Sequence, residues 1–261
     1  MADFQIIAQL GEGRLGRVYL ARDPQGALVA LKQGAADDIA REAAVLAQLT
    51  HPSIIKLLAT DEHPPTLVLE YLRGKTLATY LSAPIAPPVA AAITVQLAEA
   101  LWCAHAQGVL HRDVKPENIF VEADGRVVLA DFGVAAALGV LSDRSGERVT
   151  GTPLYLSPEQ LGAPVPLTAA SDIYALGVIL YQLLSGHLPY VAVDFATLVT
   201  AITEKPPLPL PARLPLATTV EQMLSKQPAE RPDALTLAAT MRVSASESLL
   251  REWVASSGVS D

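Results

Sequence analysis

The sequence has 261 residues, of which 51% are hydrophobic, and its 19 basic and 27 acidic side chains give a formal net charge of −8 at pH 7. This composition is typical of a folded chain with a sizeable core, and the negative balance argues against a general binder of nucleic acid or anionic membranes. The single cysteine, Cys103, excludes an internal disulfide and a zinc site built from several thiolates, and it fits a reducing, cytoplasmic location.

Neither a signal peptide nor a membrane span is expected. The first residues lack a basic segment followed by an apolar one. The longest strongly apolar stretch, 173–184, is shorter than the roughly 20 residues that a helix needs to cross a bilayer. We therefore interpret it as a buried core helix.

Hydrophobic periodicity predicts a small sheet-rich part followed by a larger helical part, joined near residues 73–74. The acidic pair at 37–38 precedes apolar residues at helical spacing, which favours a helix start. The proline-rich stretch 205–215 favours a rigid surface connection over an interaction motif. The predicted strands are 4–10, 18–22, 27–32, 54–58 and 66–71, the helices include 39–49 and 247–256, and a hairpin is predicted around 118–130.

The first chemical signal is a set of three glycines, Gly11, Gly13 and Gly16, between the first two predicted strands. Glycines permit a tight turn and let backbone amides approach a phosphate chain closely. Taken alone, a glycine-rich hairpin without a ligand is an equally good interpretation. A dinucleotide-binding fold is disfavoured because Val18 continues a strand where that fold needs a helix, and the Walker pattern is absent.

The second signal is a pair of opposite charges at positions expected to be buried. Lys32 ends the third predicted strand, and Glu42 falls on the same helix face as Ile39 and Leu46. A carboxylate on a buried face needs a partner, and Lys32 is the natural candidate. Their attraction would be about 4 kcal/mol at about 4 Å and an effective dielectric of about 20, before desolvation. The alternative is a snorkelling lysine and an edge glutamate that do not meet.

The third signal is the motif H-R-D-V-K-P-E-N at 111–118, followed by D-F-G at 131–133. With these motifs the sequence resembles the eukaryotic-type (Hanks-type) protein kinases, and specifically their bacterial serine/threonine members. The resemblance runs from about residue 11 to residue 232. It also includes the segment G-T-P-L-Y-L-S-P-E at 151–159, Asp172 with Gly177, and Arg231.

The resemblance implies an α+β, bilobal, protein-kinase-like fold in a single domain over 1–261. A small β-rich N-lobe with one main helix (about 1–72) would precede a larger, mostly helical C-lobe (about 73–240) and a short C-terminal helical tail (241–261). Three groups of residues are implied to be structural. Leu46, Leu57, His111 and Phe132 would stack between the lobes, Asp172 would hold the catalytic-loop backbone, and Glu159 with Arg231 would pin the activation segment.

The catalytic residues implied by the resemblance are Asp113, Lys115 and Lys32. Asp113 would accept the proton of the substrate hydroxyl, and Lys115 would neutralise charge on the migrating phosphoryl group. Asp131 and Asn118 would bind Mg²⁺, with Mn²⁺ as a possible substitute, because hard oxygen donors suit these ions.

The resemblance also implies an ATP site between the lobes. Gly11, Gly13 and Gly16 would cover the phosphates, and Lys32, held by Glu42, would bind the α and β phosphates. Adenine would lie between apolar surfaces and bind the backbone at the join of the lobes. The residues implied are Val18 and Ala30 above the base, Phe120 below it, Leu69 behind it, and the backbone of Glu70 and Leu72.

Substrate class and control follow from the same resemblance. Lys115 and Thr152 match kinases that act on serine or threonine of protein substrates, whereas small-molecule kinases lack the Ser-Pro-Glu segment and usually have glycine in place of Arg112. Arg112 predicts pairing with a phosphate on the activation loop. The expected autophosphorylation sites are Ser142, Ser145 and Thr150.

One departure from the family pattern is the short connection of ten positions between Lys32 and Glu42. Either the helix sits close against the sheet, or a regulatory partner protein completes this lobe. The alternative to an active enzyme is a pseudokinase or nucleotide-binding scaffold, which usually lacks one of Lys32, Asp113 or Asp131. All three are present here, so a protein kinase is preferred.

On the helix before the catalytic motif, Cys103 and His105 are expected to be core packing residues.

Overall fold

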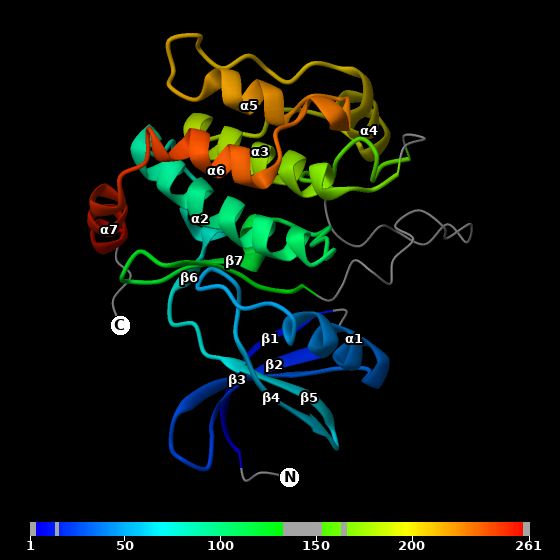
Figure 1. Cartoon of the computed structure of the whole chain (residues 1–261), viewed down its shortest axis with the longest axis vertical. Helices are drawn as coiled ribbons and strands as arrows, with labels where there is room; N and C mark the ends of the chain where they lie inside the picture. The colour runs from blue at the N-terminus through cyan, green and yellow to red at the C-terminus, as the bar shows by residue number, and fades with distance from the viewer. Residues whose placement is uncertain (1–3, 14–15, 133–152, 163–165, 258–261) are drawn as a thin grey trace.

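Figure 1 shows a sheet with one helix at one end of the molecule and a larger helical part at the other. This computed structural model describes residues 4–13, 16–132, 153–162 and 166–257. Short two- and three-residue strands lie on the side of the helical part that faces the sheet (Figure 1). The α+β, two-lobed fold class expected from the resemblance is confirmed.

The N-terminal part is a five-stranded antiparallel sheet in the order β1-β2-β3-β5-β4. Its hairpins connect strands that are adjacent in the sequence, and β5 lies between the central strand β3 and the edge strand β4. The strands are β1 (Gln5–Gly13), β2 (Gly16–Arg22), β3 (Leu28–Gln33), β4 (Leu57–Glu62) and β5 (Pro65–Glu70).

Among the described residues of this part, one segment is helical, α1 (Ala36–Leu46), and it contacts β5 and β4. Asp37 and Asp38 lie in its first turn, where the helix dipole favours negative charge. The residues that it buries are Ile39, Glu42 and Leu46, which are spaced three and four apart and so share one face. Glu42 therefore lies on the buried face, as predicted.

The predicted strand at 54–58 is partly wrong, because β4 begins only at Leu57. Ile54 instead forms an isolated parallel bridge with Leu129, and Ile55 N–H donates to Leu129 O at 3.0 Å. Both isoleucines are buried. An apolar run indicates burial but not the sheet that it joins, and here the run connects the N-terminal sheet to the hairpin of the other part.

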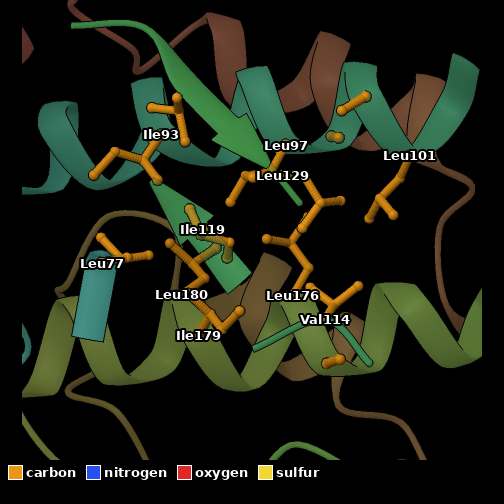
Figure 2. Packing of buried hydrophobic residues seen from close by; sticks show 14 of the residues in the cluster. Leu77, Ile93, Leu97, Leu101, Val114, Ile119, Leu129, Leu176, Ile179 and Leu180 are labelled. Carbon is orange, nitrogen blue, oxygen red and sulfur yellow. The ribbon is translucent and has the colours of Figure 1, made fainter. Parts of the chain in front are cut away.

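Two long helices, α2 (Pro87–Ala106) and α3 (Ala169–Ser185), form the centre of the C-terminal part. The hairpin of β7 (Ile119–Val121) and β8 (Val127–Leu129) packs on them. Figure 2 shows side chains from all these elements meeting in one core, among them Ile93, Leu97 and Leu101 of α2, Leu176, Ile179 and Leu180 of α3, and Ile119 and Leu129 of the hairpin.

The remaining elements are short and surround this core. They are β6 (Lys75–Thr76), η1 (Leu77–Tyr80), η2 (Pro116–Asn118), α4 (Phe195–Glu204), α5 (Ala217–Met223), η3 (Pro228–Glu230), α6 (Ala234–Arg242) and α7 (Glu247–Ser256). The strand β6 pairs with β7 in a three-stranded sheet with β8. The helix predicted at 247–256 is confirmed as α7, and the hairpin predicted around 118–130 is confirmed as β7–β8.

In the described part of the chain, α2 alone has the length and apolar composition of a helix that could cross a membrane. It is 20 residues long, and 67% of its most apolar window is buried inside the protein. Core helices meet the same criteria, so this is weak support for a membrane span. The stretch 173–184 lies within α3 and is buried, as predicted.

The segment 153–162 is tied to the C-terminal part by a buried ion pair. Glu159 and Arg231 meet at 2.6 Å, and neither side chain is exposed. The Ser171 hydroxyl donates to the same carboxylate at 2.7 Å, and Arg231 also donates to Ala170 O at 2.8 Å. The predicted Glu159–Arg231 pair is therefore formed, with hydrogen bonds that satisfy both charges.

Candidate active site

The loop between α2 and β7 is held in place by one buried carboxylate on α3. Asp172 accepts hydrogen bonds from His111 N–H at 2.9 Å and from Arg112 N–H at 2.7 Å. Arg112 has φ of 64°, a left-handed conformation that costs energy for a residue other than glycine. The two hydrogen bonds to Asp172 stabilise this turn, which confirms the predicted anchoring of the catalytic-loop backbone.

Three predicted site residues meet around the carboxylate of Asp113. Lys115 Nζ lies 2.7 Å from Asp113 Oδ2, and the side-chain amide of Asn118 donates to the same oxygen at 3.1 Å. The Asn118 amide also donates to Asp113 O at 2.9 Å. The Asp113 side chain is 29% exposed, so it reaches solvent while its orientation is fixed. A carboxylate held in this way is suited to accept a proton from an approaching hydroxyl group.

A second cluster forms around Lys32 on β3. Its ammonium group lies 2.7 Å from Glu42 Oε2 and 2.9 Å from Oε1, so the predicted pair is confirmed. It also lies 2.6 Å from Asp131 Oδ1, a contact that was not predicted. Burial lowers the pKa of Lys32, but the carboxylates of Asp131 and Glu42 outweigh burial and raise it overall. The lysine is therefore charged at neutral pH.

The β7–β8 hairpin brings together the backbone segments that carry the two predicted metal ligands. Asn118 directly precedes β7 and Asp131 lies two residues past the end of β8, and Ala130 N–H donates to Asn118 O at 2.8 Å. Asp131 has φ of 62°, so the chain turns sharply at this residue. The carboxylate of Asp131 and the carboxamide of Asn118 offer oxygen donors of the kind that Mg²⁺ binds.

Part of the predicted column of residues between the lobes is assembled. The rings of His111 and Phe132 meet edge to face, with centroids 4.6 Å apart. His111 also contacts Ala130 O through Nε2 at 2.9 Å. Leu46 and Leu57 belong to the same hydrophobic core as Phe132. The backbone before Asp131 is therefore held by packing from both parts of the molecule.

The predicted adenine-site residues lie on neighbouring strands. Ala30 pairs with Leu69 across β3 and β5, and Val18 pairs with Lys32 across β2 and β3. The remaining residues of this set follow at the end of β5 and on β7. All the apolar members, Val18, Ala30, Leu69, Leu72 and Phe120, are buried or half-buried in one core.

The glycine-rich segment is a hairpin between β1 and β2, with Gly13 paired with Gly16. Gly16 has φ of +124°, and a side chain there would collide with the backbone of Gln33. A Cβ at Gly11 or Gly13 would meet no atom within 4 Å. Thus Gly16 is required by the fold, whereas the space beside Gly11 and Gly13 is open to a ligand.

Comparison with known proteins identifies the family of the chain. Residues 4–242 match the family model described as the protein kinase domain. The chain belongs to the protein kinase family. It is 37% identical over 202 residues to the probable serine/threonine-protein kinase PknB of Lactococcus lactis, covering 72% of this chain and 32% of that protein.

Two further relatives are bacterial proteins with similar names. PkaB of Streptomyces coelicolor, a serine/threonine-protein kinase, is 34% identical over 255 residues, covering 89% of this chain and 61% of PkaB. PrkC of Bacillus subtilis, also named a serine/threonine-protein kinase, is 36% identical over 201 residues, covering 72% of this chain and 31% of PrkC. The kinase chain thus spans about one third to three fifths of the length of these relatives.

Besides the contact of Lys32 with Asp131, two further contacts near the candidate site are not predicted by the sequence. His105 is expected to be a core residue, and its side chain is largely buried, but its Nε2 lies 2.8 Å from Asp172 Oδ2. Arg126, in the turn of the hairpin, lies 2.9 Å from the carboxylate of Glu70 at the end of β5. No motif spacing in the sequence links either pair.

The predicted phosphorylation sites Ser142, Ser145 and Thr150 lie outside the described residues, as does Thr152. Arg112, their predicted partner, is described and half-buried. Its backbone carbonyl accepts a hydrogen bond from the Gln160 side chain at 2.8 Å. The loop that carries Asp113 is therefore joined directly to the segment 153–162.

Substitutions of two glycines are expected to separate ligand binding from folding. Gly13→Ala should raise the KM for ATP, because the added methyl group would occupy space that is open to the nucleotide. It should change the free energy of unfolding by less than about 1 kcal/mol, because a Cβ there meets no protein atom within 4 Å. Gly16→Ala should destabilise the protein by about 1–3 kcal/mol or more, because it adds strain at positive φ. Denaturant unfolding and steady-state kinetics measure both effects. An unchanged KM in Gly13→Ala would argue against a phosphate chain beneath this hairpin.

Proposed function

We propose that this chain is a serine/threonine protein kinase that transfers the γ-phosphoryl group of MgATP to hydroxyl groups of protein substrates. The observation that carries the proposal is the ion pair of Lys32 with Asp131 at 2.6 Å, because it joins strand β3 of the N-terminal sheet to the residues that follow β8 in the other part of the molecule. One cluster of charged side chains holds Lys32 with Glu42 and Asp131, and a second holds Asp113 with Lys115 and Asn118. The names of the relatives support the same activity.

In the proposed reaction, Asp113 orients the substrate hydroxyl in line with the γ-phosphorus and accepts its proton as the new O–P bond forms. Lys115, 2.7 Å from Asp113, lies close enough to neutralise negative charge on the transferred group. Asn118 holds the backbone and the carboxylate of Asp113 through its amide. Catalysis by these residues is mainly positioning and charge neutralisation.

The nucleotide is proposed to bind at the end of the β1–β2 hairpin. Gly11, Gly13 and Gly16 would cover its phosphates, and Lys32, fixed by Glu42, would bind the α and β phosphates. Lys32 is paired with Asp131 in the structure, so its ammonium group would exchange part of that contact for the phosphates when a nucleotide binds. The proposed adenine site consists of Val18, Ala30, Leu69, Glu70, Leu72 and Phe120.

We propose Asn118 and Asp131 as the ligands of Mg²⁺, or of Mn²⁺ in its place. Both residues offer oxygen donors, and the backbone hydrogen bond from Ala130 to Asn118 joins the segments that carry them. The metal, when bound, would supply positive charge to the phosphate oxygens. The Asn118 amide nitrogen faces Asp113, which leaves the side-chain oxygen as the donor toward a metal.

Control by phosphorylation is proposed for the loop that follows Asp131. Autophosphorylation at Ser142, Ser145 or Thr150 would place a phosphate where Arg112 can bind it, through a charge-assisted contact. Because Arg112 directly precedes Asp113, such a contact would act on the catalytic loop. Mass spectrometry of the fully active protein tests this, and an unmodified loop in that protein would rule it out.

A regulatory partner at the N-lobe is a further part of the proposal. The helix α1 has only 11 residues, and a groove of about 800 Å³ lies between its C-terminal half and β4. The Lys32–Glu42 pair forms without any partner, so a partner would adjust the position of α1 rather than create the pair.

We propose a single kinase domain over 1–261 that acts in the cytoplasm on protein substrates.

Labelled ATP with magnesium and a generic basic protein tests the activity. Label is expected on serine or threonine with the wild-type chain, and Lys32→Met should lower kcat by about 10²–10³-fold, the typical effect of losing one electrostatic contact to the reacting group. Nucleotide binding without transfer in the wild-type chain would favour a nucleotide-binding scaffold instead.

A further inference from the structure

The helix α7 lies outside the segment that matches the kinase family, which ends at residue 242. It is nevertheless an integral part of the fold, since Leu250 and Val254 are 1% and 0% exposed. Ser246 N–H donates to Pro88 O at 3.1 Å, which fixes the start of α7 against the N-terminal end of α2. Figure 1 shows α7 beside this end of α2, on the side of β6 and β7.

One aromatic residue of α7 reaches the segment that follows the join between the lobes. The rings of Trp253 and Tyr80 have centroids 4.8 Å apart and are tilted by 53°. Tyr80 is the last residue of η1, and burial raises its pKa. Its hydroxyl group is buried and has no hydrogen-bond partner among the described residues. The position of this ring is therefore set by packing, to which Trp253 contributes directly.

The segment η1 in turn contacts the proposed catalytic machinery. It packs against η2, the turn that contains Asn118, and against β7. Through its amide, Asn118 holds the proposed base Asp113. The strand β6, which leads directly into η1, pairs with β7 at Phe120. A shift of η1 would therefore be transmitted both to the catalytic loop and to the floor of the proposed adenine site.

The same helix also supports the far end of the hairpin. At Gly125, in the β7–β8 turn, an added Cβ would lie 3.0 Å from Cγ of Arg251 on α7. The carbonyl of Gly125 accepts a hydrogen bond from Gln96 on α2 at 3.0 Å. Thus α7 contacts both η1 and the turn of the hairpin that carries Asn118 and precedes Asp131.

We propose that Trp253 is a positioning residue for phosphoryl transfer, which acts through Tyr80 and η1 on the catalytic loop. The inference rests on the proposed kinase function and adds to it a residue beyond the family match. Trp253 touches neither substrate nor nucleotide in this proposal. Its effect is to keep η2, and with it Asn118 and Asp113, in the reactive arrangement.

The test compares Trp253→Ala with Trp253→Phe and with Leu249→Ala, a control on the same helix at a side chain that is 41% exposed. Trp253→Ala is expected to lower kcat by about tenfold, since a misplacement of about 1 Å at a reacting group costs up to about 100-fold. Trp253→Phe should restore most of the activity, and Leu249→Ala should match the wild-type chain. Circular dichroism at the assay temperature corrects each kcat for the folded fraction.

A double-variant cycle tests the route through Tyr80. Tyr80→Ala alone should resemble Trp253→Ala, and the double variant should lose no more kcat than either single variant, because both remove one contact. Additive losses would overturn the route. A wild-type kcat in Trp253→Ala, or a loss explained by the unfolded fraction, would overturn the positioning role.

Amide hydrogen exchange distinguishes failure of this inference from failure of the kinase assignment. In Trp253→Ala the amides of η1 and η2 should exchange faster than in the wild-type chain, while those of α3 should not. This readout needs no catalytic turnover. If the wild-type chain transfers no phosphate, the proposed function fails. Faster exchange at η1 and η2 in Trp253→Ala would still support the proposal that Trp253 holds these two segments in place, and unchanged exchange there would refute it.

Discussion

Replacing Asp113 with Asn is expected to lower kcat by about 10²–10⁴-fold, the usual contribution of a positioned general base. The amide has almost the same shape as the carboxylate but cannot accept the hydroxyl proton. The KM for ATP should change little, because Asp113 contacts Lys115 and Asn118 rather than the proposed nucleotide residues. Steady-state kinetics with a serine-containing substrate measures both constants.

Folding should survive the Asp113→Asn substitution, since the side chain is 29% exposed and lies at the surface of the loop. A change in the free energy of unfolding within about 1 kcal/mol is expected. The matched control is Asp37→Asn, which neutralises an exposed aspartate on α1 and should leave kcat unchanged. A variant at Asp113 with wild-type kcat would remove this residue from the catalytic role.

The largest expected effect on stability comes from the ion pair between Glu159 and Arg231. Substituting Arg231 with Met should lower the free energy of unfolding by about 3–5 kcal/mol, because it leaves the Glu159 carboxylate buried without its cation. The variant also loses the contact of the guanidinium with the Tyr174 ring, whose centroid is 4.9 Å away. Urea unfolding measures the loss.

A second substitution separates the cost of the unpaired charge from the cost of lost packing. The double variant Arg231→Met with Glu159→Leu removes both charges and should recover a large part of the stability, since apolar pairs often replace buried ion pairs without loss. A loss below about 1 kcal/mol in the single variant would contradict a tightly coupled buried pair.

Because of this ion pair, we expect the stability of the fold to depend on pH in the acidic range. Burial raises the pKa of Glu159, but the hydrogen bonds from Arg231 and Ser171 lower it by more than burial raises it. The net pKa is therefore below its ordinary value near 4.5. A carboxyl group with a depressed pKa contributes stability that is present above its unfolded-state pKa and is lost as the pH falls through the folded-state pKa. The difference in thermal stability between the wild-type chain and Glu159→Gln should therefore shrink as the pH falls below the unfolded-state pKa near 4.5 and through the lowered folded-state pKa.

Residues whose environment follows from local periodicity were predictable from the sequence. Glu42 shares a face of α1 with Ile39 and Leu46, so its burial could be inferred, and the strand position of Lys32 made this lysine its natural partner. The hairpin and α7 were predicted because alternating and helical apolar patterns mark them clearly.

Prediction failed where the pattern of a helix or an apolar run does not indicate which residue a side chain contacts. The helix α2 is apolar on almost all faces, so nothing in its pattern indicates that His105 meets Asp172. The run that contains Ile54 is apolar enough for a strand, yet its bridge goes to Leu129 in the other part of the molecule. In both cases the hydrophobic periodicity indicates that the residue is buried but not which distant residue it contacts.

The sequence by itself determined the family, the kinds of chemical group at the site and most of the local elements, because these depend on motifs and on spacing within a few turns. Only the tertiary structure decided the contacts between distant segments. Lys32 and Asp131 are 99 positions apart, His105 and Asp172 are 67 apart, and Glu70 and Arg126 are 56 apart. Such pairs form only when tertiary packing, within one lobe or between the two, brings their elements together, and local pattern carries no information about that packing.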